Sequence, residues 1–100
     1  MSIRHIVVWR LTETDEAVKA GQIAEAVTRF RALAEEVTTV RSLEVGANVA
    51  YPEKNWDLGL AMVFDDEEGL RAYQEHPSHE ELAAFVRSIV RDRASIDLAL

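Results

Sequence analysis

Two histidines and a tyrosine lie close together in the segment Tyr73-Gln-Glu-His-Pro-Ser-His79. Imidazole is the side chain best suited to exchange protons near neutral pH, and a tyrosine hydroxyl can donate a hydrogen bond to a carbonyl oxygen that gains negative charge. Tyr73 and His79 therefore fit proton abstraction from a carbon next to a carbonyl group. In the alternative interpretation, Tyr73 packs in the core and His79 is a surface residue in the first turn of a helix.

The two histidines of this segment have different neighbours. His76 precedes Pro77, which disfavours helical geometry, so we expect His76 to end one helix. Ser78, with Glu81 three residues later, matches a capping box and predicts that Ser78 caps the next helix. His79 then lies in the first turn, where the helix dipole disfavours the imidazolium ion and should lower the pKa of His79. A neutral imidazole is a usable general base.

Other kinds of site find little support in the sequence. The chain has no cysteine, which excludes disulfides, thiolate nucleophiles and cysteine-based zinc sites. The spacing His-x-x-His around a proline is a weak indication of a metal, and we predict no metal site. The four glycines are scattered, so there is no glycine-rich phosphate loop, and we predict no cofactor.

Length and composition indicate one globular domain that spans residues 1–100, with 48% apolar residues. The net charge of -7 disfavours nucleic acid and anionic lipid as partners, because both are bound through clustered basic residues. The N-terminal segment is short and carries charges inside its apolar run. We therefore predict neither a signal peptide nor a membrane span, and we expect a cytoplasmic protein.

Hydrophobic periodicity predicts a β-α-β-β-α-β order. Strands are expected over residues 3–11, 42–49, 56–65 and 95–100. A long amphipathic helix is expected over residues 15–37, capped by Thr12 or Thr14. The second helical region begins after Asp65 or Asp66, is broken at Pro77 and ends with an apolar stripe that reaches Val90. This order is typical of the ferredoxin-like α+β fold, a four-stranded antiparallel sheet with helices on one face.

The first strand carries apolar residues on both faces at its centre. Helices can cover only one face of the predicted sheet, so the face that holds Ile6, Val8, Ala61 and Val63 needs another cover. A second copy of the same sheet is the simplest cover. We therefore predict a homodimer in which two open sheet faces stack about a two-fold axis as a closed barrel.

His5 lies on the other face of the first strand, beside Ile3, Val7 and Trp9. If that face meets the helices, His5 is an isolated polar side chain that must find a hydrogen-bond partner. It is then either a satisfied core histidine or a pocket residue that acts as an acid, a base or a hydrogen-bond donor.

Four segments carry a family resemblance: IRHIVVWRL, SLEVGANVA, VFDDEEGLRAYQEHPSH and SIDLAL. Together they resemble the stress-responsive A/B barrel (Dabb) domain family, and the resemblance covers nearly the whole chain. The most specific part is Tyr-x-x-His-Pro-x-His, followed by LEVGAN at residues 43–48. The resemblance implies a dimeric α+β barrel, but it does not imply one activity, because most members of the family have no assigned reaction.

One plant branch of this family cyclises a linear tetraketide by an aldol-type condensation, with a histidine and a tyrosine in a pocket between helices and sheet. By position, these residues match His79 and Tyr73, and a further pocket histidine on the first strand matches His5. Another pocket histidine, on the third strand, has Leu58 in its place here. If the chain is an enzyme, the resemblance implies a polyketide-cyclase-like lyase or isomerase that acts by proton abstraction.

Two functional hypotheses follow from these observations. In the first, an apolar pocket between helices and sheet holds a small carbonyl compound, with His79 as the base, Tyr73 as the carbonyl anchor and His5 as a further polar contact. The expected substrate-binding residues of that pocket are Phe30, Leu58 and Phe85. In the second hypothesis, the chain is a stress-associated structural dimer with no small-molecule chemistry, and its histidines serve structure alone.

Overall fold

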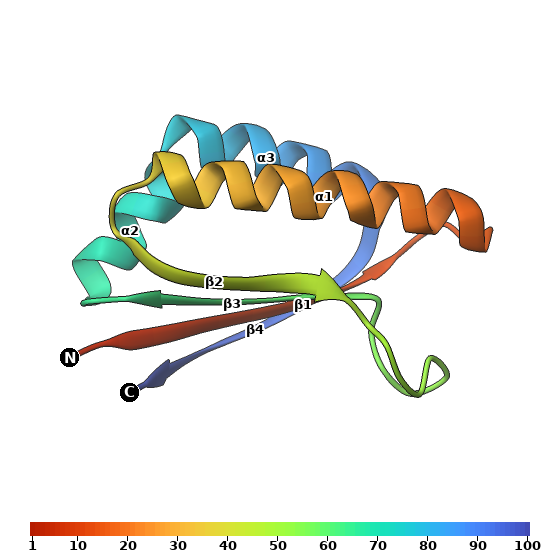
Figure 1. The fold of residues 1–100 in the computed structure, drawn as a ribbon, viewed down its shortest axis with the longest axis horizontal. Helices are drawn as coiled ribbons and strands as arrows, with labels where there is room; N and C mark the ends of the chain where they lie inside the picture. Colours follow the sequence, from red (N-terminus) through yellow and green to blue (C-terminus); the bar gives the residue numbers. More distant parts are fainter.

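A four-stranded antiparallel sheet supports three helices, which all lie on one of its faces (Figure 1). The computed structural model describes residues 1–100. The strands are β1 (Ile3–Leu11), β2 (Val40–Ala47), β3 (Leu58–Phe64) and β4 (Val90–Ala99), in the spatial order β2-β3-β1-β4. The helices are α1 (Glu16–Glu36), α2 (Glu67–Glu75) and α3 (Pro77–Ile89). This is the ferredoxin-like fold that the sequence predicted. None of the helices combines the length and apolarity needed to cross a bilayer.

A cluster of 17 buried apolar residues fills the space between the sheet and the helices. Burial alternates strictly along β3 and through most of β1, so every second side chain of these central strands points into the cluster. Helix α1 adds Ile23, Ala26, Phe30 and Leu33, which recur at helical spacing. The helical face of β1 and β3 therefore forms the floor on which any site between sheet and helices is built.

The helix caps differ in part from the predicted ones. Helix α1 begins after Asp15, whose carboxylate accepts a hydrogen bond from the Val18 N–H at 3.0 Å. The expectation that Thr12 or Thr14 caps this helix is therefore wrong, because Asp15 occupies the capping position itself. Asp66 caps α2, as predicted, and accepts from the Gly69 N–H at 2.8 Å.

His76 separates the two helices α2 and α3, and it caps both of them. Its Nδ1 atom accepts a hydrogen bond from the Ser78 N–H at 3.1 Å, and Pro77 occupies the first helical position. The prediction that His76 ends a helix is confirmed, but the capping box at Ser78 is wrong. The Ser78 hydroxyl instead bonds the Glu36 carboxylate at the end of α1.

Strands β2 and β4 also differ from the predicted ranges. Strand β2 starts at Val40 and ends at Ala47, so Val49 lies in the following loop with 96% of its surface exposed. Strand β4 starts at Val90 rather than Ser95, directly after the last residue of α3. It pairs with β1 along the whole length of that strand, with a register shift between Arg10 and Leu11. The first half of β4 therefore lies beside β1, where residues 91–94 had no predicted structure, and Val90 belongs to the strand rather than to the predicted helix.

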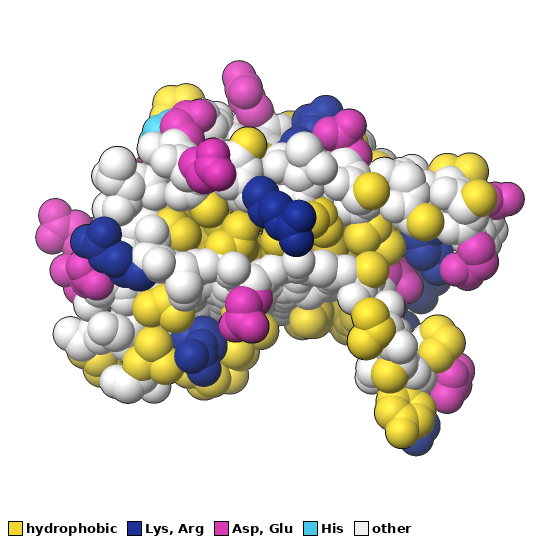
Figure 2. All heavy atoms as spheres, viewed as in Figure 1, with side chains coloured by type: hydrophobic (Ala, Val, Ile, Leu, Met, Phe, Trp, Pro, Cys, Tyr) yellow, Lys and Arg dark blue, Asp and Glu magenta, His cyan; other side chains and the backbone are white.

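The sheet face opposite the helices has no cover within the chain (Figure 1). The strand register places Ile6 between Ala61 on β3 and Ile96 on β4, so these apolar side chains lie side by side on this open face. The loop between β2 and β3 projects beyond the same face, and Figure 2 shows hydrophobic side chains gathered on it. Val49 and Tyr51 in this loop are exposed.

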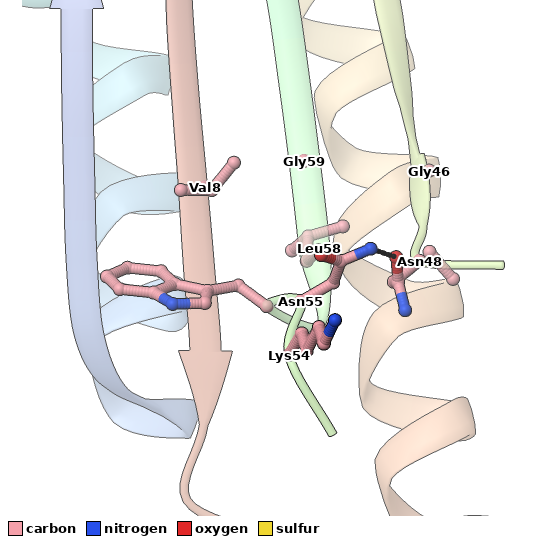
Figure 3. Close-up of a pocket in the computed structure, with 9 residues that line it drawn as sticks. Val8, Gly46, Asn48, Lys54, Asn55, Leu58 and Gly59 are labelled. Carbon is pink, nitrogen blue, oxygen red and sulfur yellow. Dashed lines mark hydrogen bonds between the residues drawn. The ribbon is translucent and has the colours of Figure 1, made fainter. Parts of the chain in front are cut away.

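A hollow of about 390 Å³ lies on the open face next to this loop (Figure 3). Gly46 and Gly59 face each other there across β2 and β3, and Val8 and Trp56 also line the hollow. A Cβ atom at Gly46 would meet no other atom within 4 Å, and one at Gly59 would meet only Val8, at 3.8 Å. The single chain therefore has room for side chains at both positions and leaves that room empty.

Candidate functional site

A single cavity of about 370 Å³ is lined by three side chains that the sequence singled out, His5, Tyr73 and His79. They come from three different elements, β1, α2 and α3. The cavity lies between α3 and the β1–β4 half of the sheet, and its wall is mostly apolar. Prominent apolar wall residues are Val7, Trp9, Phe30, Leu60, Leu82 and Val86. A cavity of this size and composition suits a small, mostly apolar molecule.

Tyr73 contacts both histidines edge-on. Its ring centroid lies 4.7 Å from that of His79 and 6.4 Å from that of His5. Only 1% of Tyr73 is exposed, and this burial raises the pKa of its hydroxyl, against the opposing effect of the positive charge on Arg93. The phenol therefore keeps its proton near neutral pH, which makes Tyr73 a hydrogen-bond donor for an oxygen in the cavity.

His5 is held by a carboxylate that sequence analysis did not identify. Its Nδ1 atom lies 2.6 Å from the Oδ1 atom of Asp97, which the β1–β4 register places directly opposite His5. A carboxylate only accepts hydrogen bonds, so Nδ1 carries the proton and the Nε2 atom of a neutral ring is left free to accept one. A carboxylate in this position fixes the orientation and tautomer of an imidazole. Asp97 is therefore a positioning residue for His5.

His79 lies in the first turn of α3 and is half-buried. Burial lowers the pKa of its imidazole, and the nearby Glu80 carboxylate opposes this shift. The sequence predicted the direction of the shift but assigned it to the helix dipole, whereas burial is the main cause. The Nδ1 atom of His79 is buried and has no hydrogen-bond partner. A buried polar atom without a partner costs about 1–3 kcal/mol of stability, which a ligand that reached it would recover.

Comparison with known proteins assigns the chain to a family. Residues 3–100 match the model of the Stress responsive A/B Barrel Domain. The chain belongs to this family. A relative described as the uncharacterized protein SCO4036 of Streptomyces coelicolor is 30% identical over 88 residues, which cover 85% of this chain and 87% of the relative.

Several solved structures similar to this A/B barrel domain are described as dimeric proteins of unknown function. One from Thermobifida fusca is 29% identical, with a TM-score of 0.87 over 100% of this chain and 92% of that one. Another, from Bacteroides fragilis, is 24% identical, with a TM-score of 0.89 over 99% and 96% of the two chains. Both are described as ferredoxin-like, which agrees with the fold of this chain, and their dimeric state supports self-association.

Not all residues predicted to line the pocket of the A/B barrel domain reach it. Phe30 lines the cavity, but Leu58 and Phe85 do not. Leu58 pairs with Trp9 near the far end of β1 and borders the hollow of Figure 3 instead. The Cζ atom of Arg29 lies 4.1 Å from the centroid of the Phe85 ring, so Phe85 packs towards α1. Both residues lie in the predicted elements. Leu58 does not reach the cavity because of its position along β3, and Phe85 because of its position around α3.

The remaining histidine, His76, lies outside the cavity of the A/B barrel domain. Its Nε2 atom is 3.6 Å from the Glu36 carboxylate, which agrees with a structural role between the helices. No group of three histidine, aspartate or glutamate side chains has a geometry that could hold a metal ion.

Replacing His79 with leucine should stabilise this A/B barrel domain by about 1 kcal/mol, because the substitution removes a buried polar atom without a partner. For a domain of this size, the melting temperature should rise by about 4–8 °C. The stability difference between the variant and wild type should increase below pH 6.5, the ordinary pKa of histidine. In that range the imidazole of His79 is protonated in the unfolded wild type, whereas its lowered pKa keeps it neutral in the folded wild type.

Urea unfolding of wild type and His79→Leu at pH 5.5 and pH 7.5, at one protein concentration, measures both effects. Wild type should lose more stability than the variant on going to the lower pH. A variant less stable than wild type at pH 7.5, or an equal loss in both proteins, would contradict this account of His79.

Proposed function

We propose that this A/B barrel protein binds a small, mostly apolar carbonyl compound in the cavity of His5, Tyr73 and His79 and removes a proton from the carbon next to the carbonyl group. One observation carries the proposal. Three titratable side chains from three elements converge on a single apolar cavity, and Tyr73 contacts both histidines. A core that used these residues only for packing would not need to gather them around empty space.

The roles follow from the state of each side chain. His79 accepts the proton, because its lowered pKa keeps the imidazole neutral near pH 7. The negative charge moves to the carbonyl oxygen, where the Tyr73 hydroxyl donates a hydrogen bond to it. His5, oriented by Asp97, presents its Nε2 atom as a further polar contact. The resulting enolate can be reprotonated at another position, as in an isomerase, or can attack a second carbonyl group of the same molecule, as in a cyclising lyase.

The three histidines allow a test of binding without any substitution. Titration with 4-phenyl-2-butanone should shift the imidazole NMR signals of His5 and His79, which line the cavity, and leave that of His76 unchanged. His76 is therefore an internal control. If the ketone shifts none of the three signals, or shifts all of them equally, the cavity is not its binding site. The protein would then fit the alternative hypothesis of a structural dimer without small-molecule chemistry.

We also propose that the open face of the sheet is the surface through which two copies associate. Ile96 and Leu98 are 55% and 42% exposed in the single chain, and they continue the apolar surface of Ile6 and Ala61. The unfilled space at Gly46 and Gly59, beside the projecting loop, leaves room for side chains of a second copy. Two copies related by a two-fold axis through this face would cover the same apolar surface on each other.

A further inference from the structure

Three arginines border the cavity of His5, Tyr73 and His79. Arg87 comes from α3, and Arg91 and Arg93 come from the first half of β4. No aspartate or glutamate is among the residues that line this cavity. The chain as a whole has 18 acidic and only 11 basic residues apart from histidine. One wall of the cavity is therefore positively charged in an otherwise acidic protein.

Two of these guanidinium groups have no carboxylate partner. Elsewhere, Arg29 pairs with Glu25 at 3.1 Å and Arg41 pairs with Asp65 at 2.7 Å. At the cavity, Arg91 bonds its neighbour Asp92 at 3.1 Å, whereas Arg87 and Arg93 form no ion pair. The guanidinium group of Arg93 reaches only the Ser95 hydroxyl, at 3.2 Å. Arg87 and Arg93 are therefore free to bind an anion.

The sheet register directs Arg93 towards the cavity. Arg93 lies opposite Trp9, and Asp97 opposite His5, so both β4 residues are on the helical face of the sheet. Arg93 lines the same cavity as Tyr73 and His79, the two side chains proposed for the chemistry, and its positive charge lowers the pKa of both. An anion held by Arg93 would therefore be close to them.

We infer that the ligand of this cavity carries a carboxylate, so that the substrate class is an apolar keto acid. This inference rests on the proposed function and adds the group that orients the substrate. The planar guanidinium groups of Arg87 and Arg93 bind the carboxylate, since their donors match its two oxygens. The apolar part of the ligand packs on Trp9, Leu82 and Val86. The ketone then lies within the group of Tyr73 and His79.

A matched pair of ligands tests this inference. The acid 4-oxo-4-phenylbutanoate and its methyl ester share the ketone and the ring, but only the acid carries a negative charge. Calorimetric titration at low and high salt should show that wild type binds the acid at least about tenfold more tightly than the ester, because a single charge-assisted hydrogen bond already accounts for that difference. This preference should shrink at high salt, because salt screens the interaction.

Substitutions assign the preference to particular arginines. Arg93→Gln and Arg87→Gln should each weaken binding of the acid and leave binding of the ester unchanged. Arg71→Gln is the control, because Arg71 is an exposed residue of α2 outside the cavity, and it should bind both ligands like wild type.

The possible results separate the two proposals. Equal binding of acid and ester by wild type, or a preference for the acid that survives both cavity substitutions, overturns the keto acid inference, while binding of the ester still supports the carbonyl site. A preference that depends on Arg87 and Arg93 but leaves the His5 and His79 signals unchanged supports the anion site and contradicts the proposed chemistry. Failure of both ligands to bind overturns both proposals.

Discussion

Replacing Ile96 with aspartate is expected to convert a dimer of this protein into a monomer. Ile96 lies on the open face opposite Ile6 and is 55% exposed in the single chain, so the substitution should disturb the monomer little. In a dimer formed through this face, it would bury two unpaired carboxylates, one from each chain. Each such charge costs several kcal/mol, so self-association should weaken about 100-fold or more.

Light scattering at micromolar concentration measures this change as a loss of half the molecular mass. Val18→Asp is the matched control, because Val18 is also a large exposed apolar residue, at 48%, but lies on α1 in the helical layer. It should leave the dimer intact. Monomeric wild type, or a dimer that tolerates Ile96→Asp, would show that the open sheet face does not hold two copies together.

The second large effect is expected from His79→Gln on proton exchange at the carbon next to a ketone. Glutamine keeps a polar side chain of similar size but cannot act as the base, so the protein-dependent part of the exchange rate should fall about 10²–10⁴-fold. Tyr73→Phe should lower the rate about 10²–10³-fold, because the carbonyl oxygen loses its hydrogen-bond donor. Deuterium uptake by 4-phenyl-2-butanone in D2O, followed by NMR, measures these rates.

His76→Gln is the control for this series, since His76 caps two helices and lies outside the cavity. Its rate should match that of wild type once the folded fraction is equal. The pH profile adds a separate test. Because burial lowers the pKa of His79, the base stays unprotonated, and the rate should persist, below pH 6.5. If the rate already falls above pH 6.5 as the pH is lowered, or if His79→Gln exchanges as fast as wild type, His79 is not the base.

Local patterns explain why the sequence was enough to predict the order of elements. Apart from His5, apolar residues fill every second position of β1, and they recur once per helical turn from Ile23 to Leu33. Each pattern repeats several times within its segment, so the segment alone indicates a strand or a helix. The break between α2 and α3 was also predictable, because Pro77 restricts the residue before it. The cap itself was not, because a histidine side chain replaced the expected serine at the start of α3.

The contacts of the candidate site depend on long-range register, which one sequence does not specify. The bond between His5 and Asp97 joins residues 92 positions apart. Asp97 could be recognised as a polar position between Ile96 and Leu98, but only the pairing of β4 with β1 shows that it meets His5. Likewise, Leu58 and Phe85 were predicted in the correct elements, and their position along the strand or around the helix excluded them from the cavity.

Strand β4 contributes to two surfaces at once, and this constrains how it can change. Its odd-numbered residues Arg93 and Asp97 lie on the helical face of the sheet, where Arg93 lines the cavity and Asp97 bonds His5. Its even-numbered residues Ile96 and Leu98 form part of the open face. A slip of one residue against β1 would exchange the two sets and would place charges on the apolar face and isoleucine beside His5. A single insertion or deletion in this strand would therefore damage both surfaces together, whereas substitutions can alter either surface alone.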